Sequence, residues 1–216
     1  MSHEVNNSAG SVTSVGSLLD SMRSYAPQLA EGDRADHEEA IAVASTRLEN
    51  LRRFMSGFAD VARLPLPDLR PHDLRRLVDE LLVLLRPQLQ ERRIEVAWTS
   101  APDLAPVAID RNQIEQALVN VLQNAMESIC RDGRIEITLA SENGGPPTLR
   151  IHDSGPGIPP EARPLLFTPF YSSKRDGRGI GLTLVREILA QHRFPFGLDN
   201  DPTGGATFSI GLQPQA

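Results

Sequence analysis

A proline-rich segment most strongly limits how this 216-residue chain can fold. Residues 64–71 read LPLPDLRP, with three prolines in a short stretch. Proline ends helices because it lacks the backbone N–H and restricts the residue before it. The chain is therefore predicted to divide here into a first unit over residues 1–63, a linker over 64–73 and a second unit over 74–216.

The first unit is predicted to be an antiparallel helical hairpin. Apolar residues within 36–63 alternate three and four positions apart, as in a helix with one buried seam; they are Ile41, Ala44, Leu48, Leu51, Met55, Phe58 and Ala62. Residues 4–29 carry a weaker stripe, and AEGDRAD between the two stretches predicts a turn. Because a lone hairpin would expose its seam, we expect it to pair with a second copy as a four-helix bundle, which makes the chain a homodimer.

The second unit alternates between helical and strand periodicities. Helical spacing predicts helices over residues 74–89, 110–130 and 182–191. Alternating apolar residues predict strands over residues 94–99, 134–140, 148–152 and 206–212, and SENGGPP predicts a hairpin turn. This order indicates a two-layer α/β sandwich with helices on one face of a mixed sheet. With the helical first unit, the predicted fold class is α+β.

Composition argues against several kinds of partner and location. The net charge of −6 argues against a nucleic-acid surface, which is usually basic. Cys130 is the single cysteine, so an intrachain disulfide is impossible. No run approaches the ~20 apolar residues of a membrane span, and the start lacks the pattern of a signal peptide. We expect a cytoplasmic chain without a membrane segment, although a longer parent protein could carry one upstream.

Two asparagines on the helix over 110–130 are the first candidate site residues. Asn120 and Asn124 are four positions apart, so they share one face of a helix that is otherwise apolar on its core side. Their neutral amide oxygens suit a Mg²⁺ ion that keeps several waters and shares phosphate ligands. Two surface or capping asparagines are the competing interpretation.

The stretch IHDSGPGIP follows a predicted strand and contains a second candidate. The carboxylate of Asp153 could accept a hydrogen bond from an exocyclic amine, such as that of adenine. Gly155 and Gly157 would let a flat ring approach the backbone. The pattern D-x-G-x-G is also a common turn, so an ordinary loop is the alternative.

Two further stretches precede the last predicted helix. LLFTPFYSSK places Phe167 and Phe170 either in the core or in an anchored loop that positions Lys174 over a phosphate. DGRGIGL leads directly into the helix, whose first backbone N–H groups can bind an anion that glycines allow to come close. It is neither a Walker loop nor a dinucleotide-binding fingerprint.

Taken in order, these stretches resemble the ATP-binding domain shared by sensor histidine kinases, DNA gyrase B, heat-shock chaperones and mismatch-repair ATPases. NVLQN resembles its N box, DSGPGI its G1 box, LFTPF its F box and GRGIGL its G2 box. GGATF resembles its last segment, with Ala206 where threonine is frequent. The resemblance implies ATP and Mg²⁺ as cofactors, with adenine at Asp153 and the metal at Asn124, supported by Asn120. It also places in the nucleotide site Gly155, Gly157, Lys174, Arg178, Gly179, Gly181 and Leu182.

Position 120 and the start of the chain indicate the kinase branch. Hydrolytic members carry a glutamate one helical turn before the metal-binding asparagine, whereas the amide of Asn120 cannot accept a proton from water. SHEVNNS resembles the H box of histidine kinases, with Ser8 in place of a proline. The resemblance implies that His3 accepts the γ-phosphoryl group while Glu4 holds the second ring N–H.

The resemblance therefore covers essentially the whole chain. Within the family, the chain looks most like the nitrogen-regulation (NtrY/NtrB-like) kinases. It implies that the phosphohistidine passes its phosphoryl group to an aspartate on a response regulator receiver domain. Asn7, one turn from His3, would orient water for phosphatase activity on that regulator. One alternative is a nucleotide-binding regulatory module that uses the hairpin only for dimerisation. Another is a protein-serine kinase or an ATPase of the same superfamily.

Overall fold

The computed structural model describes residues 21, 38–46, 48, 64–141, 145–169, 171–172 and 179–212. Residues 38–46 are helical, and Ile41 within them is buried. The rest of the predicted hairpin and the H box, with His3, Glu4 and Asn7, lie outside the described residues. A search of the described helices finds none that is long and apolar enough to cross a lipid bilayer.

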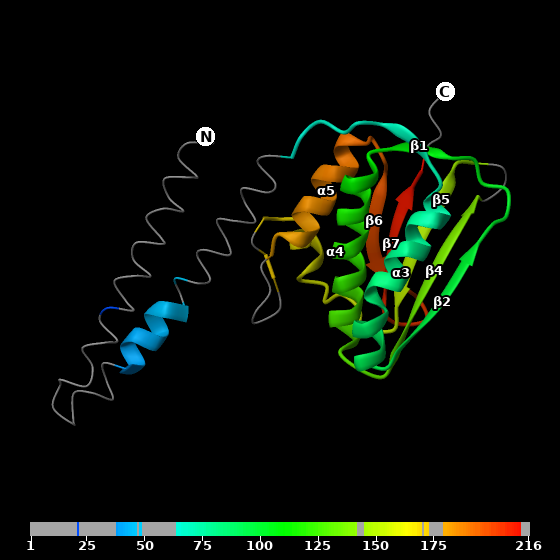
Figure 1. Cartoon of the computed structure of the whole chain (residues 1–216). Helices are drawn as coiled ribbons and strands as arrows, with labels where there is room; N and C mark the ends of the chain where they lie inside the picture. The colour runs from blue at the N-terminus through cyan, green and yellow to red at the C-terminus, as the bar shows by residue number, and fades with distance from the viewer. Residues whose placement is uncertain are drawn as a thin grey trace.

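A mixed five-stranded sheet forms the centre of the second unit (Figure 1). Its order is β2-β4-β5-β7-β6, with β2 parallel to β4 and every other pair antiparallel. The strands are β2 (Ile94–Ser100), β4 (Gly133–Ser141), β5 (Pro147–Asp153), β6 (Phe196–Asn200) and β7 (Ala206–Gly211). Antiparallel pairing of Ser141 with Pro147 agrees with the predicted hairpin turn between β4 and β5.

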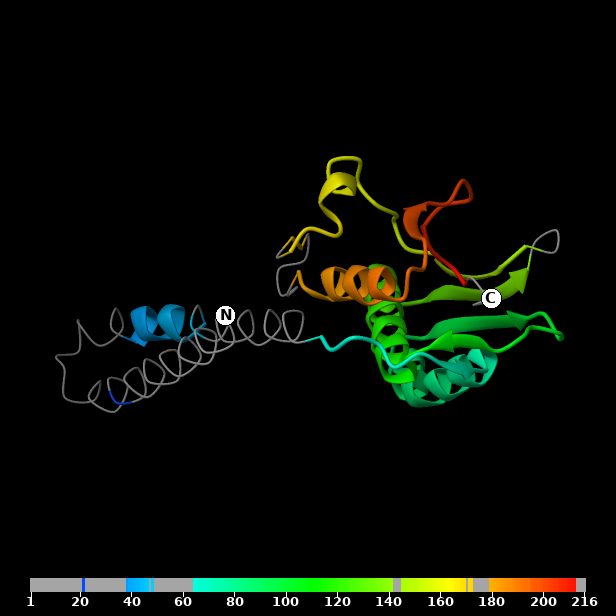
Figure 2. The same cartoon turned by 90° about the horizontal axis from the view of Figure 1, so that it is seen from above.

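Three described helices cover one face of this sheet, namely α3 (Leu74–Glu91), α4 (Arg111–Ile129) and α5 (Gly181–Gln191) (Figures 1 and 2). In β4, the buried residues Ile135, Ile137 and Leu139 alternate with exposed ones, because successive side chains point to opposite faces of a sheet. The prediction of a two-layer α/β sandwich with helices on one face is confirmed. Predicted helix and strand ends agree with the observed ones within two residues.

Part of the predicted linker is attached to the second unit. Strand β1 (Arg70–His72) pairs antiparallel with β3 (Val107–Ile109), and neither strand was expected. Upstream of β1, the amide of Gln113 donates a hydrogen bond to the carbonyl of Pro65 at 2.9 Å. The backbone N–H of Asp68 donates to the carboxylate of Asp110 at 3.1 Å. The chain from residue 65 onward therefore lies against the start of α4.

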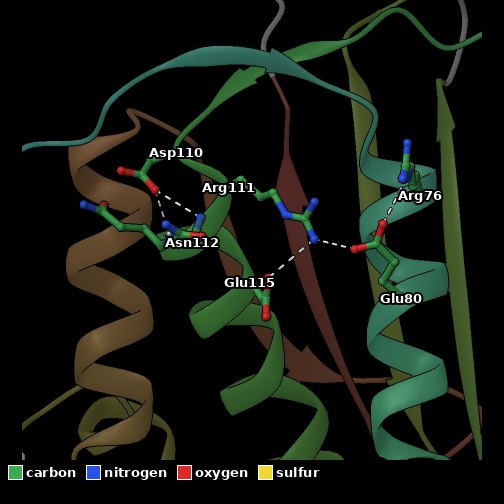
Figure 3. Close-up of polar contacts among 7 residues, drawn as sticks. Arg76, Glu80, Asp110, Arg111, Asn112 and Glu115 are labelled. Atoms are coloured by element: carbon green, nitrogen blue, oxygen red, sulfur yellow. Dashed lines mark hydrogen bonds and ion pairs between the residues drawn. The ribbon is translucent and has the colours of Figure 1, made fainter.

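Asp110 organises the beginning of α4, the helix that carries both candidate asparagines. As the N-cap, its side chain accepts hydrogen bonds from the backbone N–H groups of Asn112 and Gln113 (Figure 3). Its own N–H donates to Nε2 of His192 at 3.0 Å. His192 is buried at the end of α5, and burial lowers the pKa of its ring. This ring therefore joins α5 to α4.

Charged side chains join α3 to α4 on the surface (Figure 3). Arg111 of α4 pairs with Glu80 of α3 and lies 3.8 Å from Glu115, while Arg76 lies 3.0 Å from Glu80. The hydrogen bond from Arg111 is the main cause of the lowered pKa of Glu80. Because exposed ion pairs contribute little to the free energy of unfolding, this network links the two helices at the surface but adds little stability.

Candidate functional site

A cavity of about 590 Å³ lies between α4, the sheet and the chain that follows β5. Its walls come from residues 120–128 of α4, from β5 to β7, from residues 157–166 and 171–172, and from the start of α5. Figure 2 shows the segment containing the short 3₁₀ helix η2 (Arg163–Leu165) apart from α5, and Arg163 contacts Asp199 of β6 at 3.0 Å. The volume is that of a typical site for a small ligand.

The start of α5 forms one end of the cavity and is open to an anion. Helices α3 and α4 are capped by the side chains of Asp73 and Asp110, whereas Ile180 at the start of α5 makes no side-chain cap. Because no side chain of the described residues caps the start of α5, its first N–H groups can bind an anion. Gly179 and Gly181 line the cavity at this end.

Asn120 and Asn124 face the same end from α4, and both line the cavity. The side-chain nitrogen of Asn120 donates to the carbonyl of Gln116 at 2.8 Å, which fixes the orientation of the amide. A Cβ on Gly181 would lie 2.8 Å from Oδ1 of Asn120, so only glycine lets α5 approach this oxygen so closely. Asn120 thus lies beside the start of α5, and Asn124 lines the cavity one helical turn further along α4.

Asp153 lies at the other end of the cavity, as the last residue of β5. Its side chain is 7% exposed and accepts a hydrogen bond from the N–H of Gly155 at 2.9 Å. Burial raises the pKa of this carboxyl, although hydrogen bonds from Gly155, Ser128 and Ala206 oppose the shift. A buried carboxylate beside a cavity is suited to accept a hydrogen bond from an amine of a ligand.

The segment opposite α4 is fixed to the sheet through aromatic rings. The rings of Phe167 and Phe196 of β6 pack edge to face with their centroids 5.3 Å apart, and Phe196 stacks on Phe208 of β7 with a centroid distance of 6.4 Å. These contacts support the interpretation of an anchored loop, with Phe167 also packing against the core. Phe170 and Lys174 lie outside the described residues.

The structure brings most of the described candidate residues to one cavity. The residues lining it include Asn120, Asn124, Asp153, Gly157, Gly179, Gly181 and Leu182. Gly155 is held to Asp153 by the hydrogen bond described above. Arg178, like Lys174, lies outside the described residues.

Sequence reasoning missed Ser128, a further polar residue on the cavity side of α4. Ser128 lines the cavity, and its hydroxyl lowers the pKa of the Asp153 carboxyl against the effect of burial. It follows Asn124 by four residues, which is the same spacing that separates Asn124 from Asn120. Extending that spacing by one step would have identified it.

Comparison with known proteins agrees with this architecture. Residues 109–216 match the family described as histidine kinase-, DNA gyrase B-, and HSP90-like ATPase. The match spans half of the chain, and the chain belongs to this family.

Two curated relatives are sensor kinases of Rhizobium meliloti (strain 1021). The C4-dicarboxylate transport sensor protein DctB is 31% identical over 99% of this chain and 33% of its own length. The sensory histidine kinase/phosphatase NtrB is 30% identical over 89% of this chain and 51% of its own length. The chain thus spans about half or less of these relatives. The resemblance to a histidine kinase catalytic core is confirmed, with a nitrogen-regulation kinase among the relatives.

Two solved structures of the histidine kinase ThkA are also similar. Its catalytic domain is 28% identical, with a TM-score of 0.62, covering 67% of this chain and 95% of that one. ThkA in complex with the response regulator protein TrrA covers 99% of this chain and 59% of that one, with 22% identity and a TM-score of 0.69. The second likeness is one of fold alone.

Proposed function

We propose that this chain is the catalytic core of a two-component sensor histidine kinase. It transfers the γ-phosphoryl group of ATP to His3, and from there to an aspartate of a response regulator. The observation that carries the proposal is the amide of Asn120, one helical turn before Asn124 in the cavity. An amide does not accept a proton from water at neutral pH, so the site favours transfer to a protein acceptor over hydrolysis.

A carboxylate does line the cavity at Glu127, but at the far end of α4 from Asn120. Seven residues of helix separate the two positions, which is roughly 10 Å along the helix axis. Glu127 is adjacent to Ser128, whose hydroxyl lowers the pKa of the Asp153 carboxyl. It is therefore unsuited to activate water beside a γ-phosphate held at the start of α5.

The two ends of the cavity orient ATP. Adenine binds at Asp153, where the carboxylate accepts a hydrogen bond from its exocyclic amine. The phosphates bind at the start of α5, where uncapped N–H groups and glycines accommodate negative charge. Leu182 contacts the nucleotide from the first turn of α5, and Lys174 and Arg178 contact the phosphates from the segment outside the described residues.

The amides of Asn124 and Asn120 fit a magnesium site. The side-chain nitrogen of Asn120 is used by the carbonyl of Gln116, which leaves Oδ1 available as a ligand. No cluster of three or more His, Cys, Asp or Glu among the described residues could hold a metal. Amide, phosphate and water oxygens would therefore complete the coordination. A bound Mg²⁺ offsets the charge of the β- and γ-phosphates.

The phosphoacceptor belongs to the hairpin over residues 1–63, which forms the homodimer. His3 attacks the γ-phosphate, Glu4 holds the second ring N–H, and Asn7 orients water for phosphatase activity. Alignment with DctB and NtrB over 99% and 89% of this chain supports the presence of this unit. Transfer to His3 requires the second unit to move relative to the hairpin, and because the chain from residue 65 onward is attached to α4, this movement would not bend the chain between Pro65 and β1.

Labelling with γ-labelled ATP and Mg²⁺ tests this function. We expect acid-labile, base-stable label on the wild type and none on His3→Gln or Asn124→Asp. Asn112→Asp is the matched control, because Asn112 lies on the same helix outside the cavity. Label that persists on His3→Gln would place the acceptor elsewhere. Bound ATP without any label on the wild type would favour the alternative, a nucleotide-binding regulatory dimer without kinase activity.

A further inference from the structure

The hairpin of β6 and β7 is hydrogen-bonded to the loop that follows Asp153. Asn200, the last residue of β6, makes two hydrogen bonds with the main chain of Ile158. Its Oδ1 accepts from the N–H of Ile158 at 2.6 Å, and its Nδ2 donates to the carbonyl of Ile158 at 2.9 Å. One side chain therefore pairs with both backbone groups of a single residue, as a neighbouring strand would.

The backbone around Ile158 is shaped by this contact. Gly157 has a φ of +79°, a conformation that L-residues rarely adopt. A Cβ on Gly157 would lie 2.9 Å from Oδ1 of Asn200 and 3.2 Å from the carbonyl of Gly205. The loop is thus pressed against the hairpin, and both Gly157 and Ile158 line the cavity beside Asp153.

Asn200 itself stays outside the cavity. Its side chain is exposed and is absent from the cavity wall, so a bound nucleotide would not touch it. Any effect of this residue on ligand affinity must therefore act through Ile158 and Gly157. This separates Asn200 from Asp153, which faces the ligand directly.

We infer that Asn200 is a positioning residue. It holds the loop that follows Asp153, at the adenine end of the cavity, in the conformation that binds the ligand, and thereby sets nucleotide affinity. The inference rests on the proposed binding of ATP in this cavity. When only a fraction of molecules has the competent loop, the apparent Kd rises in inverse proportion to that fraction. Loss of two hydrogen bonds should weaken nucleotide affinity about tenfold.

A neighbouring contact supplies the matched control. Asp199 of β6 pairs with Arg163 of η2 at 3.0 Å, so it also links the hairpin to the chain after β5. This ion pair is exposed and does not involve Ile158, so its loss should change affinity by less than about twofold. The conservative variant Asn200→Asp keeps an acceptor for the N–H of Ile158 but places a carboxylate against its carbonyl.

The experiment is calorimetric titration of the full chain with ATP, ADP and AMP, alongside the thermal unfolding of each ligand-free variant. We expect Asn200→Ala and Asn200→Asp to weaken all three ligands to the same extent, because the shared adenine end is affected. The melting temperature of the ligand-free protein should stay near that of the wild type. Asp199→Ala should bind all three ligands as the wild type does.

Three outcomes would overturn the inference. Unchanged affinity of Asn200→Ala would show that the loop does not depend on this amide. Weaker binding that appears only at temperatures where ligand-free Asn200→Ala is partly unfolded would make Asn200 a residue of the fold only. A wild type that binds none of the three ligands would instead remove the proposed function, and the inference with it.

Discussion

Two adjacent glycines allow the packing around Asp153 to be tested directly. Gly205 has a φ of +77°, and a Cβ there would overlap the carbonyl oxygen of Asp153 and lie 3.2 Å from the ring of His152. Gly204 has a φ of +105°, but a Cβ there would meet nothing within 4 Å. Both Gly205→Ala and Gly204→Ala therefore put an L-residue at a positive φ, but only Gly205→Ala makes the new Cβ collide with the backbone of Asp153.

The expected free energies of unfolding follow from this difference. A positive φ costs an L-residue about 1–2 kcal/mol, which applies to both variants. Overpacking against a fixed backbone adds about 1–3 kcal/mol, which applies only to Gly205→Ala. Replacing glycine by alanine also lowers the entropy of the unfolded chain, which stabilises both variants equally. The expected difference between their free energies of unfolding is therefore the overpacking cost alone, about 1–3 kcal/mol.

Urea unfolding and nucleotide titration together measure the effect. Gly205→Ala should unfold at lower urea than Gly204→Ala and should bind ATP more weakly, because the collision displaces Asp153. Gly204→Ala should bind ATP like the wild type. Equal destabilisation of the two variants would refute the packing described around Asp153. Wild-type affinity in Gly205→Ala would refute the role of that carboxylate in binding.

Two further predictions concern a buried carboxylate and an attached linker. Burial raises the pKa of Asp153, so its charge costs stability at pH 7. In urea unfolding at pH 7, ligand-free Asp153→Asn should have a higher free energy of unfolding than the wild type, although it should no longer bind ATP. This difference in free energy should narrow as the pH falls through the raised pKa of Asp153 toward 3.8. A difference that widens on acidification would contradict this prediction. Gln113→Ala removes the hydrogen bond to Pro65, so hydrogen exchange at the amide of Asp68 should accelerate about fivefold, and unchanged exchange would argue against the attachment.

The sandwich was predictable where periodicity was strong. Helix α4 carries apolar residues at regular helical spacing, and β4 alternates exposed and buried residues over 134–139. Strand β6 was not predicted, because FGLDN contains a glycine and ends in two polar residues. It forms because it pairs with β7, a neighbour that no local pattern reveals. Strands β1 and β3 are too short to show any period.

The candidate site divides in the same way. Asn120 and Asn124 were predictable because a four-residue spacing on one helix fixes their common face. The hydrogen bonds of Asn200 to Ile158 join residues 42 positions apart, and the link from His192 to Asp110 spans 82 positions. Neither residue belongs to a motif that local reasoning could single out.

The sequence by itself determined the strongly periodic helices and strands, the family boxes and the residue types at the ends of the cavity. These properties depend on neighbours within one helical turn or a few strand residues, which a linear pattern records. The tertiary structure alone decided that the proline-rich segment joins the second unit, that α5 begins against Asn120, and that β6 holds the loop after Asp153. Such contacts arise only when sheet order and helix packing bring distant segments together, so they depend on the complete fold.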